Sequence, residues 1–359
     1  MTDCREIFAG RTNLTDMARM NYSDSDLNFA KTVASINIGS GVSLLCLSIL
    51  GVIGNSVVIY CVHKFEKSSI TDIFVGNLAI ADFLFSSFLP VWAVERFYQG
   101  IWIMSEFICE FATFISLLNL YASVALLMVM SVDRYFAVVY PLKAIATRTK
   151  QLAWKAITVA WVVASGFAAK AFFFRKVVSC MCGWQFQEHM SSLYFVFRIT
   201  VGFILPVAVI IYCYIKIFLT VSKRHDDLGS DELQRKASDV RGNYSMKRRH
   251  SIRDIRFFHN ANKKLTRTAF CIIIAFLVCW TPNQILNVVY TFNPSYATYH
   301  VFIITSKLSE ILAMCNSCVT PLVYIASKPK LPLKILNSLR GKQINRLHNQ
   351  STVMRGNKT

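Results

Sequence analysis

Seven long apolar segments alternate with polar segments along the chain. They lie at 38–62, 70–94, 107–138, 153–174, 193–221, 267–291 and 299–326. Each has about 20 residues or more, the length that an α-helix needs to cross the hydrocarbon core of a bilayer. A spanning segment must satisfy its backbone hydrogen bonds within itself, so the pattern predicts transmembrane helices. We therefore expect an all-α membrane protein with a seven-helix bundle over 38–326, and with segments 1–37 and 327–359 outside the membrane.

The composition agrees with a membrane protein, because 54% of the 359 residues are hydrophobic and only 16% are charged. The net charge of +19 could indicate a nucleic-acid partner, but the basic residues gather in loops between the apolar segments. We therefore expect contact with membrane lipids and no nucleic acid. Segment 1–37 contains no apolar core of the signal-peptide type, so the first span is expected to direct insertion.

The distribution of lysine and arginine predicts the orientation. Most of the 39 basic residues fall in the first, third and fifth connections between spans and after the last span. Cytoplasmic segments carry this excess, so we expect the N-terminus outside and the C-terminus inside. Asn13 and Asn21 then become candidate glycosylation sites in the outer segment, whereas the same motif at Asn243 and Asn349 should stay unmodified.

The fifth connection, 222–262, is polar and charged and lacks apolar periodicity, which predicts a mostly disordered loop. Ser238 and Ser251 each follow paired basic residues, a pattern that basophilic kinases recognise. They are candidate phosphorylation sites, because phosphate there would reverse the local charge beside the bundle.

Polar side chains inside the apolar segments need partners. Asp82 lies in the middle of the second span, where a lone carboxylate is costly without a partner, a cation or a proton. Asn119 and Ser123 are four residues apart and share one face of the third helix. Asn316 and Ser317 lie in the seventh span. Their oxygens could coordinate a hard monovalent cation, or could simply bond neighbouring helices together.

The third span ends in an Asp-Arg pair within Ser131-x-Asp133-Arg134-Tyr135. Such charges are stable at the end of a membrane helix only when they face protein or water. Adjacent residues on a helix do not face each other, so we expect each to have further partners.

Prolines should kink the sixth and seventh helices. Trp280 lies two residues before Pro282, and Phe276 lies one turn earlier. Because proline removes a backbone hydrogen bond, a helix can pivot there when a nearby aromatic ring is pushed. Pro321 and Tyr324 form a similar arrangement in the seventh span.

As a set, these motifs resemble the rhodopsin-like (class A) G-protein-coupled receptors over about 38–326. Ser-x-Asp-Arg-Tyr-x-Ala-Val-x-x-Pro-Leu at 131–142 resembles the end of the family's third helix, and Cys-Trp-x-Pro at 279–282 is similar to its sixth. Trp161 and Pro206 also match family landmarks. Thr320 stands where the family usually has Asn, which leaves the coupling between the cation pocket and the seventh-helix switch open.

The resemblance implies roles for these residues. Coupling and switching would fall to Asp133, Arg134, Tyr135, Phe276, Trp280, Pro282, Pro321 and Tyr324. A sodium pocket would comprise Asp82, Asn119, Ser123, Asn316 and Ser317, with Na⁺ as an allosteric ion and no required cofactor. Cys109 would form a disulfide with Cys180 or Cys182 of the second outer loop; we favour Cys182, and Cys4 would be unpaired or bonded to the remaining one.

The resemblance further implies a receptor of the plasma membrane without catalytic activity. Such a receptor activates a heterotrimeric G protein and binds receptor kinases and arrestin. Ser116 and Met314 occupy the positions of the amine-binding Asp and the retinal-binding Lys, which argues against both ligands. A neuropeptide or other small peptide is favoured, with a lipid or small carboxylic acid second. The candidate ligand contacts are Trp92, Ser116, Arg198, Gln284, Asn287 and Glu310.

Arg198 could bind a ligand carboxylate through a bidentate pair. Alternatively, it pairs with Glu310 or reaches the membrane interface. An ion-coupled transporter that uses Asp82 is the alternative from another class, but no internal repeat that would support it is visible.

Overall fold

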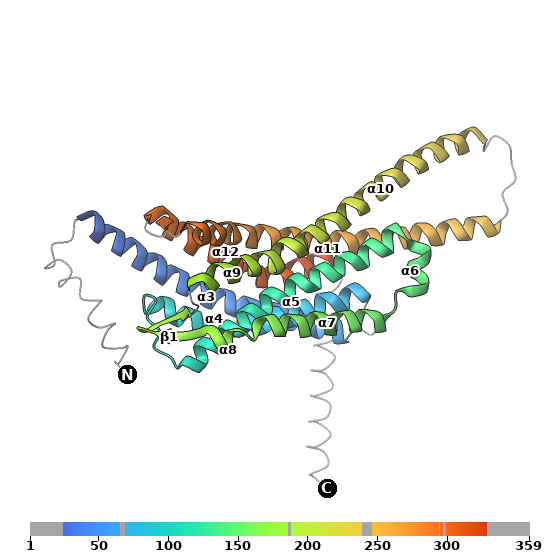
Figure 1. Ribbon diagram of the computed structural model, residues 1–359. Coiled ribbons are helices and arrows are strands. Elements are labelled where there is room, and N and C mark those ends of the chain that lie inside the picture. The colour runs from blue at the N-terminus through green and yellow to red at the C-terminus, as the bar shows by residue number, and fades with distance from the viewer. Residues whose placement is uncertain are drawn as a thin grey trace, which may run out of the picture.

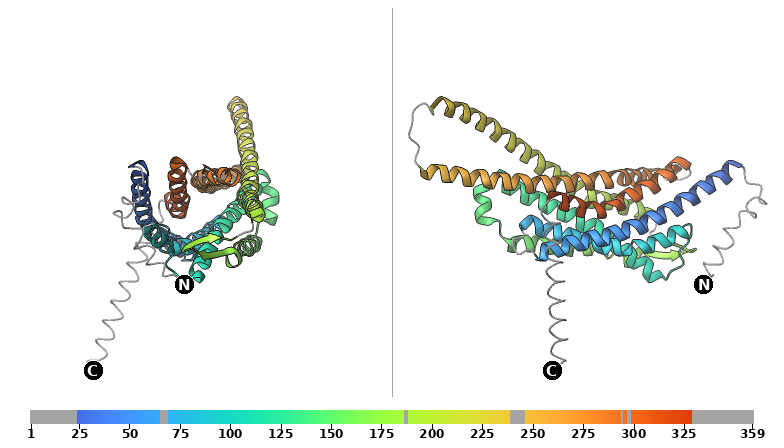
Figure 2. Two further views of the ribbon diagram at one scale, coloured as in Figure 1. Left: turned by 60° about the vertical axis from the view of Figure 1, so that its left-hand side comes forward. Right: turned by 180° about the vertical axis from the view of Figure 1, so that it is seen from behind.

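Seven long apolar helices lie side by side and cross the molecule from end to end (Figures 1 and 2). This computed structural model describes residues 24–64, 69–185, 188–238, 246–293, 295–296 and 299–328. The spans are α3 (Asp24–Lys64), α4 (Ile70–Phe97), α5 (Glu106–Val139), α7 (Lys150–Ala168) with α8 (Ala171–Phe174), α9 (Glu188–Ile199) with η1 (Thr200–Ile204) and α10 (Leu205–Ser238), α11 (Met246–Phe292), and α12 (His300–Ser327). The predicted seven-helix bundle is confirmed.

The outer surface of the bundle is apolar. Large side chains such as Val162, Phe218 and Leu322 are each about two-thirds exposed. An apolar surface of this extent is unfavourable in water but suits the hydrocarbon of a bilayer. The polar side chains of Asn55 and Asp82 are instead buried between helices.

Helix α5 lies at the centre of the bundle, where it packs against α4, α7 and α10. It begins after Ser105, whose side chain accepts a hydrogen bond from the Ile108 amide. It ends at Val139, and Pro141 opens the short helix α6 (Pro141–Thr147), since proline has no N–H with which to continue α5. Asp133 and Arg134 are thereby placed beside α6, at what we call the far end of the bundle.

A β-hairpin covers the opposite end, which we call the cavity end (Figure 1). Strand β1 (Arg175–Val178) pairs antiparallel with β2 (Met181–Trp184). Ser179 and Cys180 connect the strands with φ of 49° and 58°, as a tight hairpin turn requires. Cys182 is disulfide-bonded to Cys109 at the start of α5, which confirms the favoured pairing.

Cys180 is also disulfide-bonded. Cys4, its possible partner from the sequence, lies outside the described residues.

The fifth span contains a wide π-type turn, η1, just before Pro206. Proline lacks an N–H and its ring crowds the carbonyl four residues earlier, so a wider turn relieves both problems. Gly202 in this turn lies against α5, because a Cβ atom there would be 2.8 Å from Tyr121 Cε1. The close approach of η1 to α5 therefore requires glycine.

Three segments differ from the sequence expectations. Residues 24–37, expected in the outer tail, belong to α3. The connection 222–262, expected to be mostly disordered, is helical where it is described, because α10 runs to Ser238 and α11 begins at Met246. Neither stretch contains proline, so nothing in the backbone stops the adjoining helices from continuing. Helix α6 was not expected.

Candidate functional site

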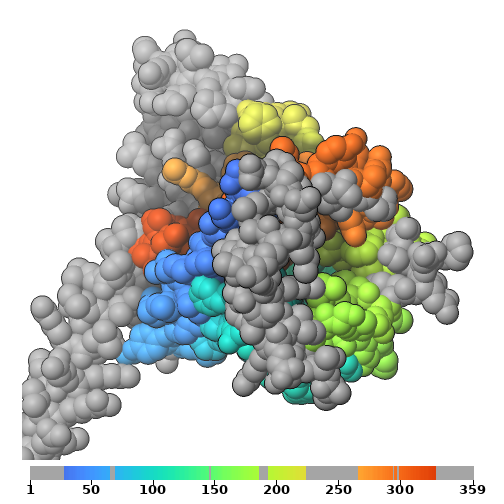
Figure 3. Space-filling model, turned by 90° about the vertical axis from the view of Figure 1, so that its left-hand side faces the viewer, coloured from blue at the N-terminus to red at the C-terminus, as the bar shows by residue number. Residues whose placement is uncertain are grey.

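A cavity of about 560 Å³ opens at the cavity end of the bundle. Figure 3 views the molecule from this end, where early (blue), middle (green) and late (orange) parts of the chain come together. The polar and aromatic lining residues include Trp92, Arg96, Thr113, Ser116, Arg175, Trp184, Arg198, Trp280, Asn283, Asn287, Tyr290, Lys307 and Glu310. Five of the six candidate ligand contacts are thus brought together.

The exception is Gln284, which is buried and does not line the cavity. Its neighbour Asn283 faces the cavity instead and accepts a 2.9 Å hydrogen bond from Asn287 Nδ2. Consecutive helix positions point about 100° apart, so a small error in helix phase exchanges them. The kink at Pro282 makes that phase hard to predict from sequence.

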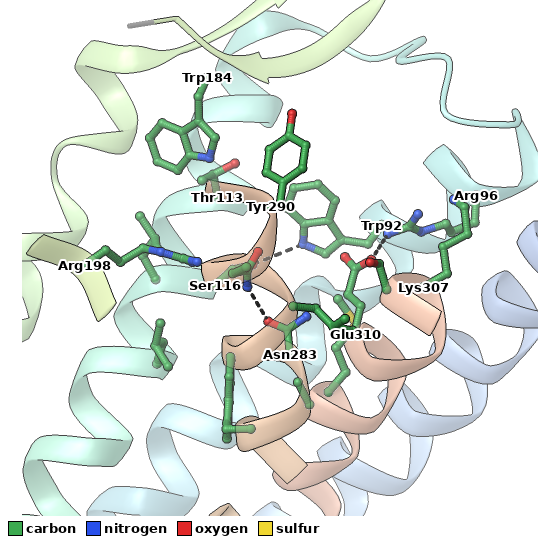
Figure 4. Close-up of a pocket in the computed structure, with 18 of the residues that line it drawn as sticks. Trp92, Arg96, Thr113, Ser116, Trp184, Arg198, Asn283, Tyr290, Lys307 and Glu310 are labelled. Atoms are coloured by element: carbon green, nitrogen blue, oxygen red, sulfur yellow. Dashed lines mark hydrogen bonds and ion pairs between the residues drawn. The ribbon is translucent and has the colours of Figure 1, made fainter. Parts of the chain in front are cut away.

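An ion pair joins α4 to α12 on one side of the cavity (Figure 4). Arg96 Nη2 lies 2.6 Å from Glu310 Oε2. The alternative in which Glu310 pairs with Arg198 is therefore wrong. Beside the pair, Trp92 Nε1 donates to Ser116 Oγ at 3.2 Å, which fixes the indole against α5.

Arg198 enters the cavity from α9, on the side opposite to this pair (Figure 4). Its guanidinium carbon is 5.5 Å from the ring centroid of Phe195, and its Nε is buried without a hydrogen-bond partner. It forms no ion pair with any residue that the structure describes. A guanidinium with unused donors in a partly desolvated site can bind a carboxylate strongly.

Arg175 is a lining residue that the sequence did not indicate. It sits on β1, with its guanidinium over the Trp184 ring at 5.1 Å and its Nε 3.3 Å from Cys182 Sγ. Burial lowers the pKa of this guanidinium and the charge of Glu95 raises it, but an arginine stays charged in either case. The disulfide of Cys182 and the ion pairs of Lys176 with Glu106 and Glu110 hold the hairpin against α5. The signal available in the sequence was the place of Arg175 close to Cys182.

The charged lining is mostly cationic. Arg96 is balanced by Glu310, and Lys307 Nζ donates to Asn37 Oδ1 at 2.8 Å. Neither Arg175 nor Arg198 forms an ion pair with a carboxylate among the described side chains. The cavity therefore favours a ligand that carries a negative group.

Trp280 connects the cavity with the interior. It lines the cavity, and its ring centroid lies 6.1 Å from that of Phe276, which is fully buried in the core. Both rings lie on α11 before Pro282. A ligand that displaces Trp280 would thus press on the core beside a proline kink.

Asp82 is fully buried at mid-bundle and bonded to two helices. Asn119 Nδ2 donates to its Oδ1 at 2.9 Å, and Thr320 Oγ1 donates to its Oδ2 at 2.8 Å. Ser123 Oγ is buried and has no hydrogen-bond partner within the described part of the chain. A carboxylate, an amide and an unpartnered hydroxyl are ligands that suit a hard cation.

Asn316 and Ser317, the other two residues expected in the cation pocket, are both buried on α12. Ser317 Oγ donates to the Met314 carbonyl, and the Ser317 carbonyl accepts from Asn55 Nδ2 at 2.9 Å. Asn316 is buried, but the side chains that bond Asp82 in the described part of the chain are those of Asn119 and Thr320. Thr320, which stands where the family usually has Asn, is the residue of α12 that bonds Asp82 among the described residues.

At the far end, Asp133 holds two arginines. Arg134 Nη2 lies 2.6 Å from Asp133 Oδ2, and Arg148 Nε lies 2.6 Å from Asp133 Oδ1. The expected further partner of Asp133 is thus Arg148, after α6. Tyr135 lies nearby, in ring contact with Tyr140 and Tyr212.

Pro321 and Tyr324 lie on the part of α12 that packs into the core. A Cβ atom on Gly54 of α3 would be 2.8 Å from Pro321 Cγ, so these helices approach closely. Tyr324 is buried, and its hydroxyl accepts a 3.0 Å hydrogen bond from Lys328. Asn13, Asn21 and the side chains of Ser238 and Ser251 lie outside the described residues.

Comparison with known proteins identifies the family to which this sequence and fold belong. The family model described as "7 transmembrane receptor (rhodopsin family)" matches residues 54–324. Chemerin-like receptor 2 of Macaca fascicularis is 28% identical over 309 residues, which cover 82% of this chain and 78% of that protein. Somatostatin receptor type 5 of Rattus norvegicus is 29% identical, with 78% and 72% covered. The crystal structure of squid rhodopsin has the same fold, with a TM-score of 0.70 at 21% identity over 86% of each chain.

Proposed function

This chain belongs to the rhodopsin family of seven-transmembrane receptors, and from that premise we propose that its cavity binds a small extracellular peptide and its far end activates a heterotrimeric G protein. It is a multi-pass plasma-membrane protein of a receptor family, not an enzyme, and the ion-coupled transporter is set aside. The peptide class is supported by relatives that are peptide receptors, among them those named for somatostatin, apelin and melanin-concentrating hormone.

The proposed orientation places the cavity end outside the cell. The basic residues gather in the connections and tail of the far end, as cytoplasmic segments do. A peptide that binds one state of the bundle more tightly than the other shifts the population toward it. The G protein, and afterwards receptor kinases and arrestin, would bind at the far end.

The observation that carries the ligand proposal is the guanidinium of Arg198, which forms no ion pair within the described part of the chain. It would bind a carboxylate of the peptide, either an acidic side chain or the C-terminus, through two parallel hydrogen bonds. A lipid acid or small carboxylic acid is the second candidate, since Arg198 would serve its carboxylate equally well.

We also propose that Na⁺ binds at Asp82 and favours the resting state. The support is the buried carboxylate beside the unpartnered hydroxyl of Ser123. When bound, the ion supplies a positive charge beside the carboxylate, whose hydrogen-bond partners Asn119 and Thr320 are neutral. Asp82, Asn119, Ser123 and Thr320 would hold it.

The test is nucleotide exchange on a panel of purified G proteins, stimulated by two peptide libraries that differ only in a free or amidated C-terminus. We expect agonists with a carboxylate, and Arg198→Gln should raise their half-maximal concentration about 10- to 100-fold, the effect of losing a charged hydrogen-bonded pair. Lys176→Met is the matched control, because Lys176 is a cation of the hairpin at the cavity end that does not line the cavity and pairs with Glu106 and Glu110.

Equal responses of wild type and Arg198→Gln to every agonist would contradict the proposed anchor. Activation by lipid acids and by no peptide would favour the second candidate. Exchange that Arg134→Ala abolishes would assign the coupling to the far end.

A further inference from the structure

Lys328 connects the switch tyrosine of α12 to the start of α4. Its Nζ lies 2.5 Å from Asp72 Oδ1 and donates to the Tyr324 hydroxyl at 3.0 Å. The same ammonium lies over the Tyr324 ring, 4.6 Å from its centroid. One side chain therefore makes an ion pair, a hydrogen bond and a cation–π contact at the far end.

Asp72 is a fixed anchor for this ammonium. It is buried at the third position of α4, where Oδ2 accepts hydrogen bonds from the Ser69 amide at 2.9 Å and the Ser69 hydroxyl at 3.0 Å. The Asp72 amide in turn bonds Ser69 Oγ, which completes a capping box. With Oδ2 used by the cap, Oδ1 remains for Lys328.

Tyr324 is constrained at both ends of its side chain. The ring is buried in the core, and the hydroxyl is bonded to Lys328, four residues later at the end of α12. Movement of the ring out of this site would break the hydrogen bond and the cation–π contact. Movement of the helix end would also break the ion pair with α4.

Other charges at this end do not join α12 to the bundle. Among the described residues of the far end, Asp133 pairs with Arg134 of α5 and with Arg148, which follows α6. Lys328, the C-cap of α12, pairs instead with Asp72 of α4. Arg134 Nη1 has no partner there, and residues 255–282 of α11 include neither Asp nor Glu. Restraint of the resting state therefore depends on contacts other than a carboxylate from residues 255–282 of α11.

We propose that Lys328 is a positioning residue that holds Tyr324 in its buried site through Asp72 and so limits activation without ligand. This inference rests on the proposed coupling to a G protein and goes beyond it, because it assigns the restraint to one ion pair. Loss of the pair releases Tyr324 and moves the population toward the active state.

The test compares ligand-free nucleotide exchange in wild type, Lys328→Met and Asp72→Asn. Each variant should raise basal exchange about two- to fivefold, the size expected for one partly exposed ion pair. Asn can still accept the cap hydrogen bonds, so Asp72→Asn removes the charge and keeps the helix start. The double variant should exceed neither single variant, because both remove the same interaction. Lys328→Arg should keep basal exchange low.

Lys64→Met is the matched control. Lys64 makes the same local contacts as Lys328, with a 2.7 Å hydrogen bond to the hydroxyl of Tyr60 four residues earlier and a cation–π contact of 5.2 Å, but Tyr60 lies on α3 and is no switch residue. Its variant should match wild type. Basal exchange in Lys328→Met no higher than in Lys64→Met would overturn the proposal.

A second readout separates this inference from G-protein coupling itself. In protein that contains 3-fluorotyrosine, the ¹⁹F resonance of Tyr324 is assigned by its loss in Tyr324→Phe. We expect that resonance to shift in Lys328→Met and in Asp72→Asn, and to stay in place in Lys64→Met. An unchanged resonance in both variants refutes the restraint, whether or not any G protein responds.

Discussion

Asp82 shows at the scale of single residues how a membrane bundle accommodates a buried charge. Its two oxygens accept hydrogen bonds from Asn119 of α5 and Thr320 of α12. The sequence predicted the polar cluster from its mid-membrane position, but the effect of Thr320 stayed open. A threonine hydroxyl reaches the carboxylate directly, so the residue before Pro321 links this site to α12.

Sodium dependence follows from that arrangement. The melting temperature of purified receptor should rise when sodium chloride replaces N-methylglucamine chloride at equal ionic strength, since an ion that binds only the folded state stabilises it. Asp82→Asn should abolish the rise because the carboxylate charge is lost. Asp133→Asn, which changes a carboxylate at the far end, should retain it. A rise that persists in Asp82→Asn would place sodium elsewhere.

Arg198 and Arg175 mark the limit of residue prediction. Arg198 was predictable as a candidate because an arginine near the end of an apolar segment needs a partner or water. That it meets no carboxylate depends on Arg96, which takes Glu310. Arg175 could not be predicted as a lining residue, because its place over the cavity depends on the fold of the hairpin and on a disulfide.

At the scale of elements, apolar length predicted the seven helices because the bilayer thickness sets it. The π-type turn η1 was not predicted, and it matters for the site. One extra residue in a turn rotates everything before it by about 100° relative to a regular helix. The direction of Arg198, which precedes η1, therefore could not be read from helical periodicity alone.

The packing of η1 against α5 gives a stability prediction. Gly202→Ala would place a methyl group 2.8 Å from Tyr121 Cε1, so we expect a loss of about 1–3 kcal/mol, typical of overpacking. Gly166→Ala is the control, because a Cβ there meets nothing within 4 Å and alanine favours the helix. The measurement is thermal unfolding of the two purified variants. Equal melting temperatures of Gly202→Ala and Gly166→Ala would mean that Tyr121 moves aside freely.

At the scale of the whole molecule, charge and polarity divide the receptor into two unlike ends. Arg175 and Arg198, which form no ion pair among the described side chains, face the cavity, whereas Arg134, Arg148 and Lys328 lie at the far end. Between them lies the apolar outer surface that meets lipid. The orientation stays a prediction from sequence, which depends on charge counts rather than on side-chain geometry.

Glycosylation tests the orientation. Asn13 and Asn21 should carry glycans in receptor expressed in animal cells, so glycosidase treatment should increase its electrophoretic mobility. Replacement of both by Gln should remove that shift. Asn243→Gln should not change it, because the motif at Asn243 would face the cytoplasm. A shift that depends on Asn243 would reverse the proposed topology.

The length of α11 has a mechanical consequence. From Pro282 to Met246 the helix is a lever of roughly 50 Å, at about 1.5 Å per residue. With its fulcrum at the proline, a tilt of about 10° moves the tip by roughly 9 Å, while Trp280 beside the fulcrum shifts by well under an ångström. A ligand therefore needs to displace the cavity wall only slightly, because the long arm that projects beyond the bundle turns that small shift into a large movement of its tip (Figure 1).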